Sequence, residues 1–244
     1  MAGSGRKVFA AGDVLTATDV QNYLKDQAVM VFASSAARGS AIASPTEGMV
    51  SYLSDTNNVE AYTGSAWTTV GLSGLVPVAP TSIANSGGSA STSGYTTTFT
   101  GVSSISLNGV FSADYDNYRI MVRHTGSTSY GFRIRLRASG TDASGNDYRN
   151  QQIYTSGSAT VLGAYNASTQ GEIGPGGTNA VLLGADIQDP NRSAQTGVVG
   201  QSARDGDFSN FGIVHTLSSA YDGFTLFPST GTLTGVVSVY GYRK

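Results

Sequence analysis

Five arginines form the densest group of charged side chains in the sequence. They are Arg119, Arg123, Arg133, Arg135 and Arg137. The first two and the last three occupy alternate positions of two successive β-strand patterns, so each set shares one face of its strand. We expect a hairpin turning at 125–130, which would place all five on one side. Guanidinium groups bind phosphate and carboxylate bidentately, so Arg133, Arg135 and Arg137 are candidate ligands for an anionic polymer. The alternative is a solvated sheet face, or pairing with acidic residues of a neighbouring subunit.

Four tyrosines lie in a stretch without clear strand periodicity. They are Tyr130, Tyr148, Tyr154 and Tyr165, and asparagines and glutamines surround them. Aromatic faces beside amide groups are typical of sugar-binding sites, because sugars stack on rings and hydrogen-bond to amides. We therefore predict a glycan site on loops of this region. Alternatively, these tyrosines fill the ends of a sandwich or a subunit interface.

Aspartates occur in pairs within expected loops, at 114/116, 142/147, 186/189 and 205/207. Glycosidases use two carboxyl groups facing each other across a cleft, but turns also favour Asp. His124 and His215 have no acid or nucleophile at a spacing that predicts a triad. The segment 142–147 lacks the ligand spacing of a calcium loop. We predict no enzyme, no catalytic residue, no metal site and no cofactor.

Composition favours a β-rich protein. Of 244 residues only 12% are charged and 32 are glycine, while 39% are hydrophobic, enough to form a core. A net charge of −2 gives no global field that would attract nucleic acid, so no nucleic-acid partner is expected. Cysteine is absent, which leaves oligomerisation as the expected substitute for crosslinks. No window is long and apolar enough for a signal peptide or membrane insertion.

The first 71 residues predict a helix and a small β module. Helical spacing over about 16–30, with Thr18 and Gln21 in a capping-box pattern, predicts the helix. Its apolar stripe is Val20, Tyr23, Leu24, Ala28 and Val31. So short a helix needs a partner, either the strands of its own chain or copies of itself around a threefold axis. Strand and turn patterns over about 47–70 predict the β module. Residues 1–71 are too few to bury a sufficient core alone.

Residues 72–94 are small, polar and interrupted by Pro77 and Pro80, which predicts a linker. Residues 95–244 alternate apolar and polar positions between turn signals, which predicts a jelly-roll-like β-sandwich. The candidate strands are Thr97–Phe111, Asn117–His124, Gly131–Ala138, Ala180–Ile187, Gly197–Gln201, Phe211–Leu217, Gly223–Phe227 and Thr232–Tyr242.

Two segments of the first 71 residues resemble a known family. The first is Arg6-Lys7-Val8-Phe9-Ala10-Ala11-Gly12-Asp13-Val14-Leu15-Thr16-Ala17-Thr18-Asp19-Val20-Gln21-Asn22-Tyr23-Leu24, continued at 26–32. The second is Pro45-Thr46-Glu47-Gly48-Met49-Val50, then Leu53-Ser54-Asp55, then Tyr62-Thr63-Gly64-Ser65-Ala66-Trp67. Over residues 5–71 the chain resembles the start of minor tail and tail-fibre, or receptor-binding, proteins of tailed bacteriophages of actinobacteria. The ending Val239-Tyr240-Gly241-Tyr242-Arg243 is similar to the last strand of phage fibre head domains.

The resemblance implies a homotrimer located in the virion, as part of the tail. Residues 1–71 would attach to other virion proteins of the tail or capsid and hold the trimer together. Residues 95–244 would form the head that binds a host surface glycan or wall polymer, although no residue-level binding motif carries over. One alternative is a purely structural tail-tip or capsid-decorating fibre without receptor binding. A less favoured alternative is a glycan depolymerase.

Overall fold

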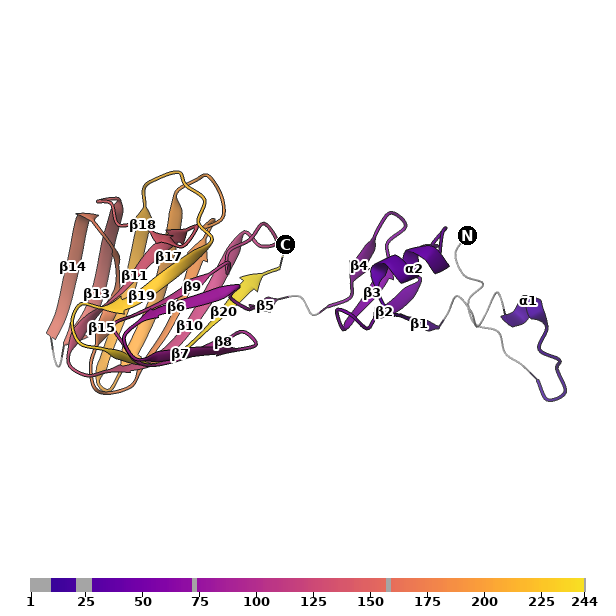
Figure 1. The fold of residues 1–244 in the computed structure, drawn as a ribbon, viewed down its shortest axis with the longest axis horizontal. Coiled ribbons are helices and arrows are strands. Elements are labelled where there is room, and N and C mark those ends of the chain that lie inside the picture. The colour runs from indigo at the N-terminus through magenta and orange to yellow at the C-terminus, as the bar shows by residue number, and fades with distance from the viewer. Residues whose placement is uncertain (1–9, 21–27, 72–73, 157–158, 244) are drawn as a thin grey trace. The chain divides into compact units, whose positions relative to one another are not determined.

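The computed structural model describes residues 10–20, 28–71, 74–156 and 159–243. The chain divides into two compact units, Met1–Ser73 and Gly74–Lys244 (Figure 1). The prediction of a mainly β protein with a small N-terminal β module and a C-terminal sandwich is confirmed.

Unit 1 is built on a four-stranded mixed sheet with the order β1-β2-β3-β4. Its strands are β1 (Val29–Phe32), β2 (Val50–Leu53), β3 (Asn58–Tyr62) and β4 (Trp67–Thr69). The strands β2, β3 and β4 pair as antiparallel neighbours, within the range that the sequence pattern of 47–70 predicted. β1 and β2 are parallel, so the chain needs a crossover between them. The crossover contains a helix that the sequence did not predict, α2 (Ser35–Ala41), capped by the Ser34 side chain.

Arg38 of α2 is buried and joins the helix to the sheet. Its guanidinium forms a salt bridge with Glu60 of β3 and donates to the Ser51 hydroxyl of β2 at 3.1 Å. The same group lies over the ring of Trp67, with its central carbon 4.2 Å from the ring centroid. Arg38 therefore joins α2 to the three strands β2, β3 and β4 through a polar cluster at the centre of unit 1.

The predicted helix over 16–30 is wrong at its C-terminal end, and its residues 21–27 lie outside the described ones. The helix α1 covers Ala17–Asp19, and its capping box joins Thr16 to Asp19, two residues before the predicted box. Val29 and Met30 belong to strand β1, because their alternating exposure and pairing with Val50 and Ser51 favour a sheet.

The predicted interface residues are therefore not one helical stripe. Val20 is exposed after α1, Ala28 lies in a bend, and Val31 is a 69% exposed residue of β1. Tyr23 and Leu24 lie outside the described residues.

Unit 2 is a sandwich of two antiparallel sheets. The larger sheet has ten strands in the order β14-β13-β18-β17-β16-β10-β20-β8-β7, with β5 pairing to β20. Its strands are β5 (Leu75–Val78), β7 (Ser89–Ser93), β8 (Thr96–Val102), β10 (Asn117–Gly126), β13 (Tyr148–Ser156), β14 (Ala159–Ser168), β16 (Val181–Gln188), β17 (Thr196–Arg204), β18 (Asp207–His215) and β20 (Leu233–Tyr242). The smaller sheet has six strands in the order β12-β11-β19-β9-β6, with β15 pairing to β11. Its strands are β6 (Ser82–Ser86), β9 (Ser104–Asn108), β11 (Tyr130–Ala138), β12 (Thr141–Asp142), β15 (Gly171–Gly176) and β19 (Gly223–Pro228).

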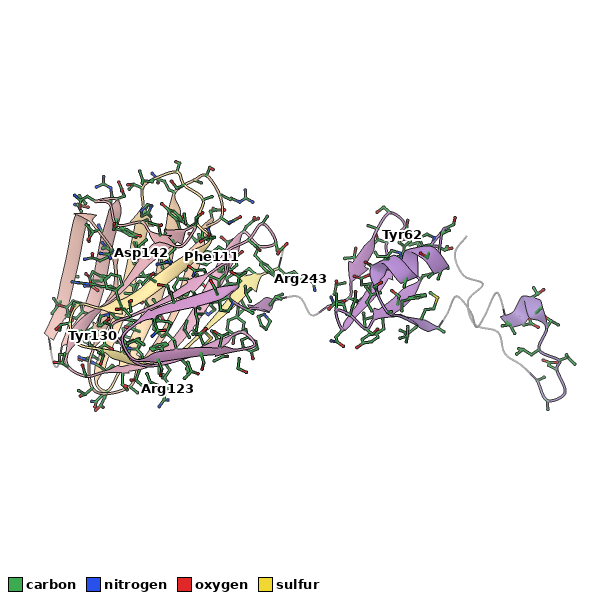
Figure 2. The ribbon with its side chains drawn as sticks, in the orientation of Figure 1. Tyr62, Phe111, Arg123, Tyr130, Asp142 and Arg243 are labelled. Carbon is green, nitrogen blue, oxygen red and sulfur yellow. The ribbon has the colours of Figure 1, made fainter. Side chains whose placement is uncertain are left out.

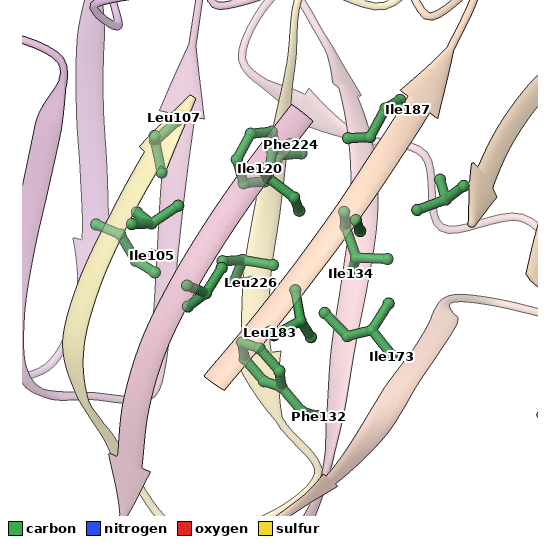
Figure 3. Close-up of a cluster of buried hydrophobic side chains, with 14 of the residues drawn as sticks. Ile105, Leu107, Ile120, Phe132, Ile134, Ile173, Leu183, Ile187, Phe224 and Leu226 are labelled. Carbon is green, nitrogen blue, oxygen red and sulfur yellow. The ribbon is translucent and has the colours of Figure 1, made fainter. Parts of the chain in front are cut away.

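The core lies between the two sheets, as Figure 3 shows. Ile120 and Leu183 of the larger sheet face Ile134 and Leu226 of the smaller one, and all four are buried. Strands such as β10 and β16 alternate buried and more exposed positions, so one face packs inward and the other faces solvent. Full burial of such a side chain stabilises the fold by roughly 1.5–3 kcal/mol.

The predicted linker 72–94 is wrong over most of its length. Residues 75–93 contain strands β5, β6 and β7, which pair with β20, β9 and β8. The Ser- and Thr-rich strand β7 forms because hydroxyl side chains tolerate the solvent-facing edge of a sheet, where Thr92 bonds to Thr97 at 2.9 Å. The unit boundary lies at Ser73 and Gly74 instead.

The predicted arginine hairpin is also wrong. β10, with Arg119 and Arg123, belongs to the larger sheet, whereas β11, with Arg133, Arg135 and Arg137, belongs to the smaller sheet. Because the chain crosses between the sheets at 127–129, the two sets lie on opposite outer faces of the sandwich. The five arginines do not form one patch.

Candidate functional site

A small hollow lies where β13 of the larger sheet meets β11 and β15 of the smaller sheet. It has a volume of about 290 Å³, at the lower end of ligand pockets in proteins. We call it the Tyr154 hollow, and its lining residues are Tyr130, Gly131, Arg133, Gln152, Tyr154, Glu172, Gly174, Pro175 and Ser229. Three residues that the sequence predicted for ligand binding, Tyr130, Arg133 and Tyr154, therefore come together here.

The register of β13 places the amide and the ring in the hollow. Gln152 pairs with Phe211 and Tyr154 with Ser209, and both partners are buried on the inner face of the larger sheet. Side chains alternate along a strand, so Gln152 and Tyr154 face inward as well. At this end of the sheet the strand packed against them is β15, which also contacts β17 and β18.

An arginine–glutamate pair forms one wall. Arg133 Nε donates to Glu172 Oε1 at 2.8 Å across paired positions of β11 and β15. The side chains are 29% and 13% exposed, so the pair is partly screened from water. The bond uses Nε, and the two Nη groups of the guanidinium are donors that it leaves for other acceptors.

The Gln152 amide carries an unpaired acceptor. Its Oε1 is buried and has no hydrogen-bond partner among the described residues. Gly163 of β14 lies opposite, where a β-carbon would come within 3.0 Å of the Gln152 amide nitrogen. Buried polar atoms without a partner are costly and uncommon, so an external donor at this point would be favourable.

Tyr130, labelled in Figure 2, forms the inner wall and is itself buried. Its hydroxyl bonds to His124 Nδ1 at 2.6 Å. Burial raises the pKa of the Tyr130 phenol and lowers the pKa of His124 to about 4. Both groups are therefore neutral at pH 7, and the ring of Tyr130 presents a fixed, uncharged surface.

The other predicted site residues lie elsewhere in the sandwich. Arg135 donates to the Thr169 carbonyl at 3.0 Å and stacks on Phe227. Arg137 is buried in bonds to Asn108, Asp142 and Thr225. These two side chains are used in internal contacts of the smaller sheet.

Tyr148 does not line the hollow, and only the backbone of Tyr165 is described. Tyr148 is buried, with its hydroxyl donating to the Ala143 carbonyl and accepting from the Leu136 amide, so in this structure it packs in the core and presents no surface to a ligand. Tyr165 pairs with Asn150 through the backbone of β14.

Sequence reasoning missed Glu172 and Ser229. Glu172 lies in β15, whose sequence Gly-Glu-Ile-Gly-Pro-Gly reads as a turn, since glycine and proline are disfavoured in strands. Ser229 follows β19, where its hydroxyl accepts from the Gly131 amide at 2.9 Å. The one signal in the sequence was the position of the polar Glu172 between Gly171 and Ile173, both of which the structure buries.

The hollow combines an aromatic ring, an amide, a hydroxyl and an ion pair, which are groups that bind a polar, partly apolar molecule. Glu172 is the one carboxylate among its lining residues. Within the described ranges, no three His, Asp or Glu side chains are grouped so as to hold a metal ion. Nor does any helix there have the length and apolar character needed to cross a membrane.

No protein-family model matches this chain, and no curated protein matches it. The fold and the hollow by themselves describe a protein with a β-sandwich unit that carries a small polar hollow.

Proposed function

We propose that this chain is a tail-fibre or minor tail protein of a tailed bacteriophage that attaches the virion to a host surface glycan or wall polymer. It acts by adhesion and not as an enzyme. The Tyr154 hollow is the observation that carries the proposal, because its groups match the chemistry of a sugar ring. The resemblance of residues 5–71 to phage tail proteins supports the setting in the virion.

A sugar unit would use the hollow through two kinds of contact. Its apolar C–H face would pack on Tyr154, and its hydroxyl groups would hydrogen-bond to the Gln152 amide and accept from Arg133 Nη. A carboxylate or phosphate on a wall polymer would also be attracted to Arg133, although Glu172 offsets that charge. A neutral or weakly anionic glycan is therefore the proposed ligand class.

The proposal includes a homotrimer with a jelly-roll-like head. The chain passes repeatedly between the two sheets, for example from β9 to β10 and from β10 to β11, as in sandwiches of this kind. Three weak sites held in one assembly bind a surface far more tightly than one site does. Residues 1–71 would dock on other virion proteins.

The test is binding of the full chain to an array of bacterial surface glycans. We expect binding to be lost in Tyr154→Ala and weakened several-fold in Gln152→Ala. Tyr95→Ala, which removes a tyrosine exposed outside the hollow, and Arg192→Ala, which removes an exposed arginine, serve as controls. Binding that persists in both hollow variants would reject the site. A folded chain that binds no glycan on the array and no actinobacterial wall polysaccharide would favour a purely structural fibre.

A further inference from the structure

The outer face of the larger sheet carries a group of exposed apolar side chains. Leu162 of β14 is 75% exposed, Leu182 of β16 57% and Val199 of β17 53%. The same face also exposes Met121, Ile153, Phe208 and Val214. Most of them alternate along their strands with buried core residues, while Ile153 and Leu162 alternate with half-buried residues, so all point away from the core. In the smaller sheet, by contrast, no large apolar side chain is exposed among the described residues.

This face is hollowed. Two depressions of about 880 Å³ and 530 Å³ lie across it and share Arg119, Gly184 and Gln201. Together they extend from β14 to β20. Gly184 and Gly212 face outward in the lining, and the absence of side chains there deepens the surface. Exposed apolar patches of this extent are uncommon on monomers and mark interaction surfaces.

The charges in the depressions are few and largely satisfied within the chain. The lining residues include three charged ones, Arg119, Arg123 and Asp186. Arg119 donates to Asp186 at 3.2 Å, and Tyr242 donates to the same carboxylate at 2.6 Å. A strongly charged partner would have few unpaired charges to bind on this face. A low content of charged residues is instead typical of the core of protein interfaces.

The end of the larger sheet adds an open edge. β14 is the terminal strand, paired through its backbone to β13 alone (Figure 1). Its ten residues, Ala159–Ser168, include no charged residue and no proline. Monomeric proteins usually protect such an edge with charges, proline or a covering segment, because an unprotected edge associates with other chains.

We propose that a second copy of this chain covers the outer face of the larger sheet, centred on the β13–β14 hairpin and the depressions next to it. The exposed side chains are mostly aliphatic, which suits protein–protein packing, whereas a glycan would need more rings and polar groups. The self-neutralised Arg119–Asp186 pair lets copies approach without a net charge at the centre. The proposed homotrimer does not specify this surface, and the Tyr154 hollow shares only Gln152 with the lining of the depressions.

The first test measures the mass of the full chain by light scattering. We expect an oligomer for the natural sequence and loss of mass towards the monomer for Leu162→Glu combined with Leu182→Glu. Leu217→Glu is the matched control, because Leu217 is 46% exposed but lines neither depression. Circular dichroism checks that each variant is folded. A chain that stays monomeric at high micromolar concentration overturns the proposal.

The second test separates this surface from association through unit 1. The chain has no cysteine, so single Leu182→Cys and Leu217→Cys variants report exposure through their rate of thiol labelling. We expect Leu182→Cys to be labelled several-fold more slowly in the oligomer, with the difference lost on dilution to monomer. Equal rates in an oligomer would overturn the proposal, and so would protection that arises only after wall polysaccharide is added. Neither result depends on glycan binding in the Tyr154 hollow.

Discussion

The side chain of Asn150 holds the backbone of Glu172. Asn150 Oδ1 accepts from the Glu172 amide at 2.9 Å, and its Nδ2 donates to the Gln170 carbonyl at 3.1 Å. One buried amide thus joins β13 to the start of β15 with the pattern of a strand pair. These two bonds position Glu172 next to Arg133.

We predict that Asn150→Ala loosens β15 and the hollow together. The substitution leaves two partly buried backbone groups without these partners, at a cost on the order of 1 kcal/mol each. Urea denaturation should show the loss of stability, and hydrogen exchange should show a faster-exchanging Glu172 amide. Unchanged exchange at Glu172 would contradict the role given to Asn150. Asn85→Ala is the control, since the Asn85 side chain bonds within an exposed turn.

Two glycines explain why Tyr130 fits in the wall of the hollow. A β-carbon on Gly126 or on Gly176 would lie well inside van der Waals contact with the Tyr130 ring. We predict that Gly176→Ala displaces the ring and costs about 1–3 kcal/mol, as overpacking does. A shift of the thermal midpoint and of Tyr130 ring signals in NMR spectra would show this. Gly212→Ala is the control, because Gly212 also lies in a strand but has open space beside it.

Alternation of apolar residues was enough to predict a sandwich, because half-buried strands repeat every two residues. It failed where strands lack that signal. The described residues of β14 are all exposed or half-buried, so β14 has no alternating buried face, and β15 (Gly171–Gly176) is too rich in glycine and proline. The capping box lies at Thr16 and Asp19, two residues before the predicted one. The predicted helix also overran β1, whose pairing with the distant strand β2 depends on residues far along the chain.

The site was predictable only in part. Tyr130, Arg133 and Tyr154 meet in the hollow, but residue type cannot tell them from Arg137 or Tyr148, which the tertiary structure buries. Whether an arginine faces a ligand or an internal carboxylate depends on which sheet its strand joins. That choice is made by the crossing of the chain between β10 and β11, which local sequence does not encode.

Arg38 should govern the stability of unit 1. Arg38→Ala leaves the partly buried Glu60 carboxylate uncompensated and removes the contact with Trp67. Loss of one partner of a buried pair costs roughly 3–5 kcal/mol. Trp67 is the only tryptophan in the chain, so its fluorescence reports the unfolding of unit 1. Arg38→Met with Glu60→Leu should lose less than Arg38→Ala alone, and an equal loss would show that charge compensation is not the cause.

Two buried histidines should make the sandwich sensitive to acid. His124 bonds to Tyr130, and His215 bonds in the same way to Tyr221, six residues further along the chain in each case. Burial lowers the pKa of both rings, that of His124 from 6.5 to about 4. Asp147 partly offsets the shift at His215. The Nε2 atoms of both rings are buried without a partner among the described residues.

Because the folded pKa of His124 lies below its unfolded value, the unfolded chain binds more protons between these two values. The free energy of unfolding therefore holds above pH 6.5 and falls as the pH drops towards 4. For His124 the loss between neutral pH and pH 5 is about 2 kcal/mol. His124→Gln keeps a hydrogen-bonding group for Tyr130 but cannot titrate, so its denaturation midpoint in urea should change less over this range. If the natural sequence and His124→Gln show the same dependence on pH, carboxylates and not His124 control the acid response.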